Sequence, residues 1–124
     1  KIVCNITAIF TVEQLEKVVN VLSPDTPAIL SVFAGRIADT GIDPSEIMRE
    51  CIKISKSKPK AEILWASTRE ILNIIQANNV GCHIITVPPN LLKKNNLLNY
   101  NLKKYFLDKV KNFYNDAKKS NYKI

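Results

Sequence analysis

A serine and an arginine at the end of one apolar segment are the residues of this sequence best suited to bind a substrate. Ser31 interrupts an apolar run, and Arg36 follows it on what we predict to be a turn. A serine hydroxyl can bond a substrate hydroxyl, and a guanidinium can make paired hydrogen bonds to a phosphate. Phe33 lies two residues after Ser31 and therefore shares its face of a strand. These residue types indicate sugar-phosphate chemistry.

Polar residues also interrupt the preceding apolar segment. Alternation along a strand places Asn5 and Thr7 on one face together with Val3 and Ile9. Two polar side chains on an otherwise apolar face are candidates for catalysis. The alternative is that Thr7 suits a strand and Asn5 bonds a neighbouring backbone. The opposite face would then carry Cys4, Ile6 and Ala8.

A second hydroxyl and arginine follow the third apolar segment. We predict that Ser67 caps a helix and that Arg69 lies in its first turn, so that a hydroxyl, free amides, a positive helix end and a guanidinium meet. Taken alone, Ser67 could be only a cap, and Arg36 could form only a surface salt bridge with Asp39. Two arginines at equivalent positions after successive strands favour a shared phosphate.

Four short apolar runs, each followed by a helical pattern, must position these residues. Thr11 and Gln14 form a capping-box signature before the first helix, and Asp43 precedes a proline at the start of the second. The third begins with the capping box of residues 67–70 and ends before Gly81, which suits a left-handed turn. The apolar runs are residues 2–10, 27–33, 61–66 and 83–87.

This pattern predicts an α/β fold with a parallel sheet. A doubly wound nucleotide-binding sheet would usually have a glycine-rich first turn, and the three glycines form no such loop. A (β/α)8 TIM-type barrel has about 250 residues, so the four βα units of this chain make about half of one. We expect residues 1–92 to form these units and residues 93–124 to form a helical tail.

The net charge of +7 comes from the predicted tail. Residues 1–92 contain nine Lys/Arg and nine Asp/Glu, whereas residues 93–124 contain nine lysines and two aspartates. Such a segment could bind nucleic acid or another polyanion. Its aromatic residues lie on the apolar stripe instead of among the lysines, which argues against base stacking and a nucleic-acid partner. The stripe contains Leu102, Tyr105, Phe106, Val110, Phe113, Tyr114 and Ala117.

The cysteines and the single histidine give no sign of metal or redox chemistry. Cys4, Cys51 and Cys82 lack metal-ligand spacing and lie in apolar segments, so we expect reduced core thiols. His83 begins the last strand, where we expect a packing or hydrogen-bonding role. No segment approaches the roughly 18 apolar residues of a membrane span, and there is no export signal. We expect a cytoplasmic protein without cofactor, metal or membrane partner.

The three polar segments resemble consecutive motifs of the transaldolases, including the related fructose 6-phosphate aldolases. They are residues 5–10 (NITAIF), 31–37 (SVFAGRI) and 65–69 (WASTR), and both order and spacing match. The resemblance implies strands five to eight of a (β/α)8 barrel. It also implies an enzyme of the pentose phosphate pathway that moves a dihydroxyacetone unit between sugar phosphates through a Schiff base.

The resemblance implies a role for each candidate residue. Asn5 would line the Schiff-base region and Thr7 would help hold the catalytic water. Ser31, with Phe33 beside it, would contact the dihydroxyacetone part of the substrate. The phosphate would be bound by Arg36, Ser67 and Arg69.

The lysine that forms the Schiff base in this family has no counterpart here. It lies on strand four, in a motif that would precede Lys1, and Lys1 itself lacks the context of that motif. The chain would therefore carry the substrate contacts without the nucleophile, and we expect it to be inactive alone. Its expected partners are a sugar phosphate and either the missing half of the barrel or further copies in a homo-oligomer.

Two other functions stay open at this point. A fructose 6-phosphate aldolase would use the same contacts but release free glyceraldehyde 3-phosphate. A non-catalytic half-barrel, serving as a scaffold or an anion-binding module, would leave its first and last strands unpaired, and unpaired edges invite association.

Overall fold

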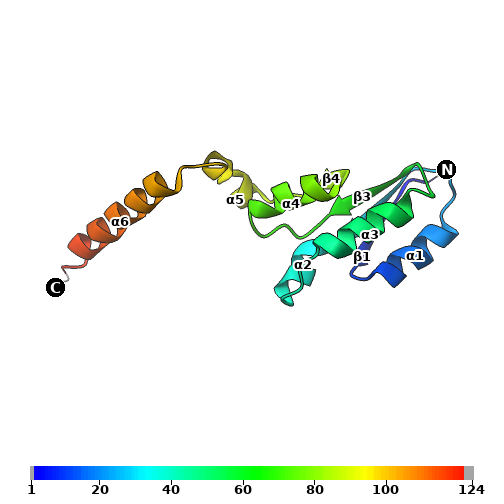
Figure 1. The fold of residues 1–124 in the computed structure, drawn as a ribbon, viewed down its shortest axis with the longest axis horizontal. Helices are drawn as coiled ribbons and strands as arrows, with labels where there is room; N and C mark the ends of the chain where they lie inside the picture. The colour runs from blue at the N-terminus through cyan, green and yellow to red at the C-terminus, as the bar shows by residue number, and fades with distance from the viewer. Residues whose placement is uncertain (1, 122–124) are drawn as a thin grey trace. The chain divides into compact units, whose positions relative to one another are not determined.

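Four parallel strands form one sheet in the sequential order β1-β2-β3-β4 (Figure 1). The computed structural model describes residues 2–121, and the chain divides into two compact units, Lys1–Leu92 and Lys93–Ile124. The sheet belongs to the first unit, and its parallel pairing confirms the predicted α/β class. The strands are β1 (Cys4–Ile9), β2 (Ala28–Val32), β3 (Ala61–Trp65) and β4 (Ile84–Ile85).

Helices alternate with these strands. One helix follows β1, two follow β2, one follows β3 and a short one follows β4 (Figure 1). This is the βα repeat predicted from the apolar runs, with one additional helix after β2. The helices are α1 (Val12–Val21), α2 (Ala34–Asp39), α3 (Ser45–Ser55), α4 (Leu72–Val80) and α5 (Pro89–Leu92).

Local sequence signals fix several helix ends. The Gln14 N–H donates to Thr11 Oγ1 at 3.2 Å, and the Thr11 N–H donates back to Gln14 Oε1 at 3.1 Å, which is the predicted capping box. Asp43 Oδ1 accepts from the Ser45 N–H at 2.9 Å at the start of α3. Gly81 ends α4 with a φ of 83°, as predicted for a left-handed cap.

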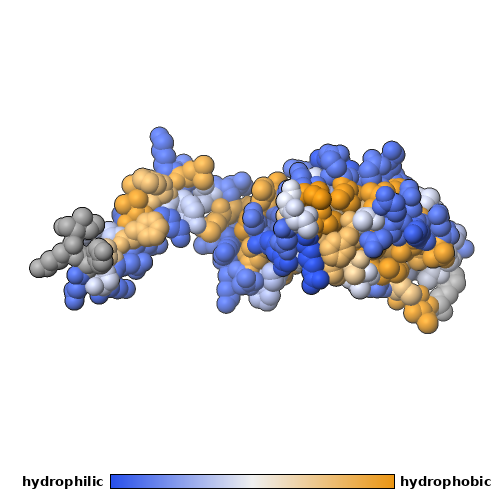
Figure 2. Space-filling model, turned by 90° about the horizontal axis from the view of Figure 1, so that it is seen from below, coloured by the Kyte–Doolittle hydropathy of each residue, from blue (hydrophilic) through white to orange (hydrophobic). Residues whose placement is uncertain are grey.

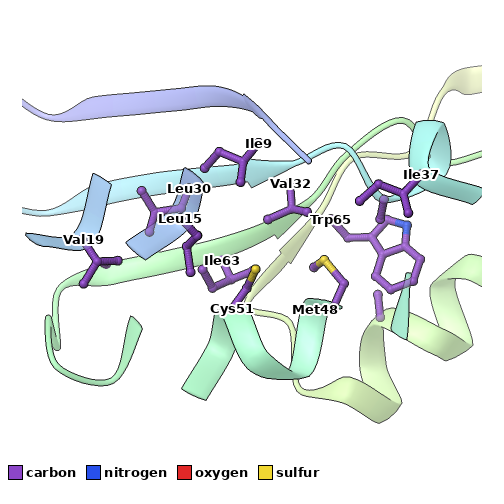
Figure 3. Close-up of a cluster of buried hydrophobic side chains, with 13 residues drawn as sticks. Ile9, Leu15, Val19, Leu30, Val32, Ile37, Met48, Cys51, Ile63 and Trp65 are labelled. Atoms are coloured by element: carbon purple, nitrogen blue, oxygen red, sulfur yellow. The ribbon is translucent and has the colours of Figure 1, made fainter. Parts of the chain in front are cut away.

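The apolar core lies between the sheet and the helices (Figure 3). Alternate residues of the strands, such as Leu30 and Ile63, are fully buried against Leu15 of α1 and Met48 of α3. Full burial of such a side chain contributes about 1.5–3 kcal/mol, so this layer is the main source of stability for the first unit. Trp65, Val32 and Cys51 are also fully buried there.

The alternation of side chains in β1 changes at Ala8. Ile6 pairs with Leu30 and Ile9 pairs with Val32, so β1 has one residue more than β2 between these pairs. Ala8 accommodates the extra residue with a left-handed φ of 61°. This bulge turns Ile9 into the core, where it is buried. The prediction that Ile9 shares a face with Asn5 and Thr7 was therefore wrong, because strict alternation assumes an unbroken strand.

Two helices differ from the prediction. Arg36 lies within the short helix α2 instead of on a turn. Helix α4 begins at Leu72, and its N-cap residue Ile71 makes no side-chain capping bond. Ser67 and Arg69 therefore lie in the loop between β3 and α4, and the prediction that they cap and open a helix was wrong.

The second unit contains the 3-10 helix η1 (Asn95–Leu97) and the long helix α6 (Leu102–Lys119). Asn101 Oδ1 accepts from the Lys104 N–H at 3.1 Å and caps α6. Most of the predicted apolar stripe is solvent-exposed, including Phe106 and Phe113. Figure 2 shows apolar surface on this unit next to hydrophilic surface. Other residues of the second unit therefore cover little of this stripe.

The cysteines occupy three different environments, and all are free thiols. Cys51 is buried, which raises its pKa to about 11, and Cys82 is partly buried with a pKa raised to about 12, also mainly by burial. Cys4 is exposed, so the prediction of a core position was wrong for this residue, which lies on an edge strand. No helix within residues 2–121 is long and apolar enough to span a membrane.

Candidate functional site

The two polar residues predicted to face one ligand from neighbouring strands are in direct contact. Ser31 Oγ donates a hydrogen bond to Asn5 Oδ1 at 2.7 Å. Asn5 pairs with Ile29 across the β1–β2 ladder, so it lies diagonally opposite Ser31 on the face that points away from the core. Ser31 is buried, whereas Asn5 and Thr7 are exposed. In this contact the Asn5 amide accepts through its oxygen, so its N–H₂ group is not used by Ser31.

Phe33 connects this pair to the first arginine. Its ring makes an edge-to-face contact with Phe10, with centroids 5.6 Å apart, and the Arg36 guanidinium carbon lies 4.9 Å from its centroid. A guanidinium over an aromatic face is attracted by the ring quadrupole. Arg36 is thus oriented by an aromatic ring that follows Ser31 by two residues.

The start of α2 is held against the loop that follows β3. The Gly35 N–H donates to the Ala66 carbonyl at 3.2 Å, and a Cβ on residue 35 would lie 1.6 Å from the Ser67 carbonyl oxygen. Only glycine allows this approach. Arg36 directly follows Gly35 in the sequence. The arginine of α2 is therefore one residue away from the contact with the Ser67 loop.

The loop from Ser67 to Ile71 is held by side chains instead of by a helix. Asn73 Oδ1 accepts from the Arg69 N–H at 2.9 Å and from the Glu70 N–H at 3.0 Å. Thr68 Oγ1 donates to the Thr86 carbonyl at 2.6 Å, which ties the loop to the residue after β4. The amides of residues 69 and 70 are therefore occupied and not free to bind an anion, contrary to the prediction.

Ser67 adopts an unusual backbone conformation within this loop. Its φ of 62° lies in the left-handed region, which costs a non-glycine residue about 1–2 kcal/mol. Ser67 and Arg69 line a cavity of about 340 Å³ together with Thr68, Thr86 and the backbone leading to Pro88. A hydroxyl and a guanidinium that share one cavity can together bind an oxyanion.

Arg69 makes an ion pair across the gap between two βα units. Its Nη2 donates to Asp39 Oδ2 of α2 at 2.8 Å. This bond is the main reason that the pKa of Asp39 is lowered and that of Arg69 is raised. The alternative role of Arg36, a surface salt bridge with Asp39, is not what the structure shows, because Asp39 forms its ion pair with Arg69. Arg36 still acts on Asp39 through its charge.

The other ionisable candidates lie elsewhere. His83 Nδ1 accepts from the Ile63 N–H at 3.0 Å, which confirms the predicted hydrogen-bonding role. Lys58 donates to the Leu22 carbonyl and Lys60 to the Asp25 carbonyl, both at the loops that enter β2 and β3. Within residues 2–92, no lysine lies on a strand. No group of three or more metal-ligating side chains occurs among residues 2–121.

Sequence reasoning missed three residues that shape this site. Gly35 belongs to the motif of residues 31–37 and Thr86 to the apolar run of residues 83–87, but no role at the site was predicted for either of them or for Asn73. A glycine directly before a candidate arginine was a usable signal, because glycine permits close backbone approach. The contacts of Asn73 and Thr86 depend on the tertiary fold and leave no local pattern.

A parallel α/β sheet with polar side chains on its strands and in the segments that follow their carboxyl ends is typical of α/β proteins that bind ligands at that edge. The comparison with protein families is more specific. The chain belongs to the transaldolase/fructose-6-phosphate aldolase family, whose model matches residues 1–124.

Curated relatives agree with this assignment. The chain is 35% identical over 92 residues to a probable transaldolase of Nitrosopumilus maritimus, a match that covers 73% of this chain and 39% of the relative. It is 40% identical over 67 residues to a probable transaldolase of Mesorhizobium japonicum, covering 53% and 31%. It is 35% identical over 92 residues to the probable transaldolase 2 of Listeria monocytogenes, covering 73% and 40%. The matches therefore span only about a third to two fifths of these relatives.

Proposed function

We propose that this chain forms strands five to eight of a (β/α)8 barrel that transfers a dihydroxyacetone unit between sugar phosphates through a Schiff base. The observation that carries the proposal is the contact of Gly35 with the Ser67 carbonyl. It joins two of the three family motifs, which lie about thirty residues apart in the sequence. The third motif joins them through the hydrogen bond of Asn5 with Ser31.

These contacts support the roles that the family motifs imply for the side chains. Ser31, whose hydroxyl is fixed by Asn5, would bind the dihydroxyacetone part of the substrate, and the Phe33 ring would bound that region. Thr7, exposed on the same face of β1, would help to hold the catalytic water near Asn5. The phosphate would be bound by Ser67 and Arg69, which line the Ser67 cavity, and by Arg36, which is not among the lining residues but directly follows Gly35 at the contact with Ser67.

The nucleophile would come from outside this chain. Amine catalysis needs a lysine with a lowered pKa in a desolvated site, and the lysines between residues 2 and 92 lie on helices or in loops. In the proposed barrel, a lysine of strand four would lie beside β1. The exposed edge of β1 would then be paired with that strand.

Borohydride trapping tests the mechanism. A protein that joins this chain to the lysine-bearing part of the barrel is incubated with fructose 6-phosphate and reduced. We expect the sugar to become attached to a lysine outside residues 1–124, and we expect the isolated 124-residue chain to give no adduct. Turnover without any adduct would contradict the Schiff-base mechanism.

A fructose-6-phosphate aldolase is the second candidate function, because the description of the matching family names both activities. Both reactions would use the same substrate contacts. The acceptor separates them: a transaldolase needs an acceptor sugar phosphate for turnover, whereas an aldolase releases glyceraldehyde 3-phosphate without one.

A further inference from the structure

Asp39 lies beside both arginines that the proposed function assigns to the phosphate. It is placed three residues after Arg36 in α2, about one helical turn away, and it accepts a hydrogen bond from Arg69 at 2.8 Å. The pKa of Asp39 is lowered first by its bond with Arg69 and further by the charges of Arg69 and Arg36. One carboxylate therefore faces two cationic side chains from two different βα units.

The ion pair is too exposed to serve mainly as a stabilising contact. The side chains of Arg69 and Asp39 are 49% and 54% exposed. Pairs of this kind contribute little to folding, because water and salt screen them. The main effect of the Asp39 bond is therefore on the orientation of the Arg69 side chain.

The bond gives the Arg69 guanidinium a direction. Arginine has a long side chain with many rotamers, and its five N–H donors form a rigid fork. Asp39 binds one of the terminal nitrogens, so the other guanidinium donors remain for a ligand, and Arg69 also lines the Ser67 cavity. The backbone of Arg69 is fixed separately by Asn73. Asn73 thus fixes the backbone of Arg69, and Asp39 fixes its guanidinium.

We propose that Asp39 is a positioning residue that orients Arg69 for the phosphate of the substrate and so raises the affinity of the Ser67 cavity for a phosphate ester. The inference rests on the proposed function, since it assumes that this cavity binds phosphate. Asp39 also lowers the repulsion between Arg36 and Arg69 when no phosphate is bound.

Charge alone predicts the opposite effect of removing Asp39. A carboxylate near an anion site repels the anion, so its neutralisation would tighten binding. Orientation predicts weaker binding, because a freely moving guanidinium loses more entropy when it binds. Glu70 supplies the matched control, because it lines the same surface depression as Asp39 and Arg69, and its carboxylate accepts no hydrogen bond within residues 2–121.

The experiment is a titration with inorganic phosphate of the protein that joins this chain to the lysine-bearing part of the barrel, and of its variants, followed by the amide resonances of Ser67 and Thr68. We expect Asp39→Asn to weaken binding about fivefold to tenfold and Glu70→Gln to leave it unchanged or tighten it. Asp39→Glu, which keeps a carboxylate, should recover most of the affinity. The Arg69 Nε–H resonance should lose its distinct shift in Asp39→Asn only, a change that a purely structural role would not cause.

Two failures can be told apart. If the unsubstituted joined protein shows no saturable shift at Ser67, the phosphate site of the proposed function is wrong and the role of Asp39 fails with it. If the chain binds phosphate and Arg69→Gln weakens it, but Asp39→Asn binds as tightly as Glu70→Gln, the role of Asp39 alone is overturned.

Discussion

Gly35 and Ser67 meet through their backbones, with no room between them for a side chain on residue 35. A Cβ at this position would lie 1.6 Å from the Ser67 carbonyl oxygen and 2.6 Å from its carbon. Both neighbours are backbone atoms, so they cannot rotate out of the way. The distance between α2 and the β3–α4 loop is therefore set by the absence of one methyl group.

Gly35→Ala should separate these two segments. We expect the free energy of unfolding to fall by about 3 kcal/mol, at the upper end of overpacking costs, and phosphate binding at Ser67 to be lost. Urea unfolding and the phosphate titration measure the two effects. Gly41→Ala is the control, because its φ of 83° costs about 1–2 kcal/mol but nothing lies within 4 Å of its Cβ position. Equal phosphate binding in both variants would contradict the proposed spacing.

Ser67→Gly should have opposite effects on the stability of the protein and on its affinity for phosphate. Glycine relieves the left-handed strain at φ 62°, which is worth about 1–2 kcal/mol and is partly offset by the greater freedom of glycine in the unfolded chain. We expect a stability equal to or slightly above that of the unsubstituted chain. Phosphate affinity should fall about threefold to tenfold, because one hydroxyl donor is lost. Ser67→Ala should lose the affinity without gaining stability.

Asn73→Ala should loosen the loop that carries Arg69. Two backbone amides lose their acceptor, and we expect a cost of about 1–2 kcal/mol, similar to the loss of a helix cap. Asn73→Asp keeps the acceptor oxygen and should remain close to the unsubstituted stability. Asn79→Ala, at an exposed position of the same helix, should change stability by less than about 0.5 kcal/mol. Equal losses in Asn73→Ala and Asn79→Ala would show that the amides find other partners.

The elements that follow a local rule could be predicted from the sequence. The β strands follow from apolar runs, α1 follows from the Thr11 capping box, and the end of α4 follows from Gly81. In each case, neighbouring residues determine the backbone by themselves. Asn5 and Ser31 were predicted to lie on neighbouring strands, but the hydrogen bond between them was not predicted, because it depends on the register of β1 and β2.

The remaining features depend on contacts between distant residues. The capping box at Ser67 predicted a helix there, but Thr68 instead bonds Thr86 after β4, and Asn73 takes the amides that a cap would have bound. The bulge at Ala8 contains no glycine, so no residue type in the sequence indicates it. Asp39 could be recognised as a partner of some arginine, but only the packing of α2 on the loop decides which one.

The Asp39–Arg69 pair should have a measurable effect on the titration of Asp39 at acid pH. Arg69 holds the pKa of Asp39 below its ordinary value of 3.8, so the pair's contribution to stability is present above that value and is lost only as the pH falls through the lowered pKa. Carbon NMR of the carboxyl groups should show this late titration. In Arg69→Gln, we expect the pKa of Asp39 to rise toward 3.8.

Asp43 is the control for this titration. Its pKa is also lowered, but the cause is hydrogen bonding with Ser45, so Arg69→Gln should leave it unchanged. Because the Asp39–Arg69 pair is half-exposed, the difference between the unsubstituted chain and Arg69→Gln should shrink as salt is raised from about 0.01 M to 1 M. An Asp39 that titrates identically with and without the arginine would show that the two side chains do not remain paired in solution.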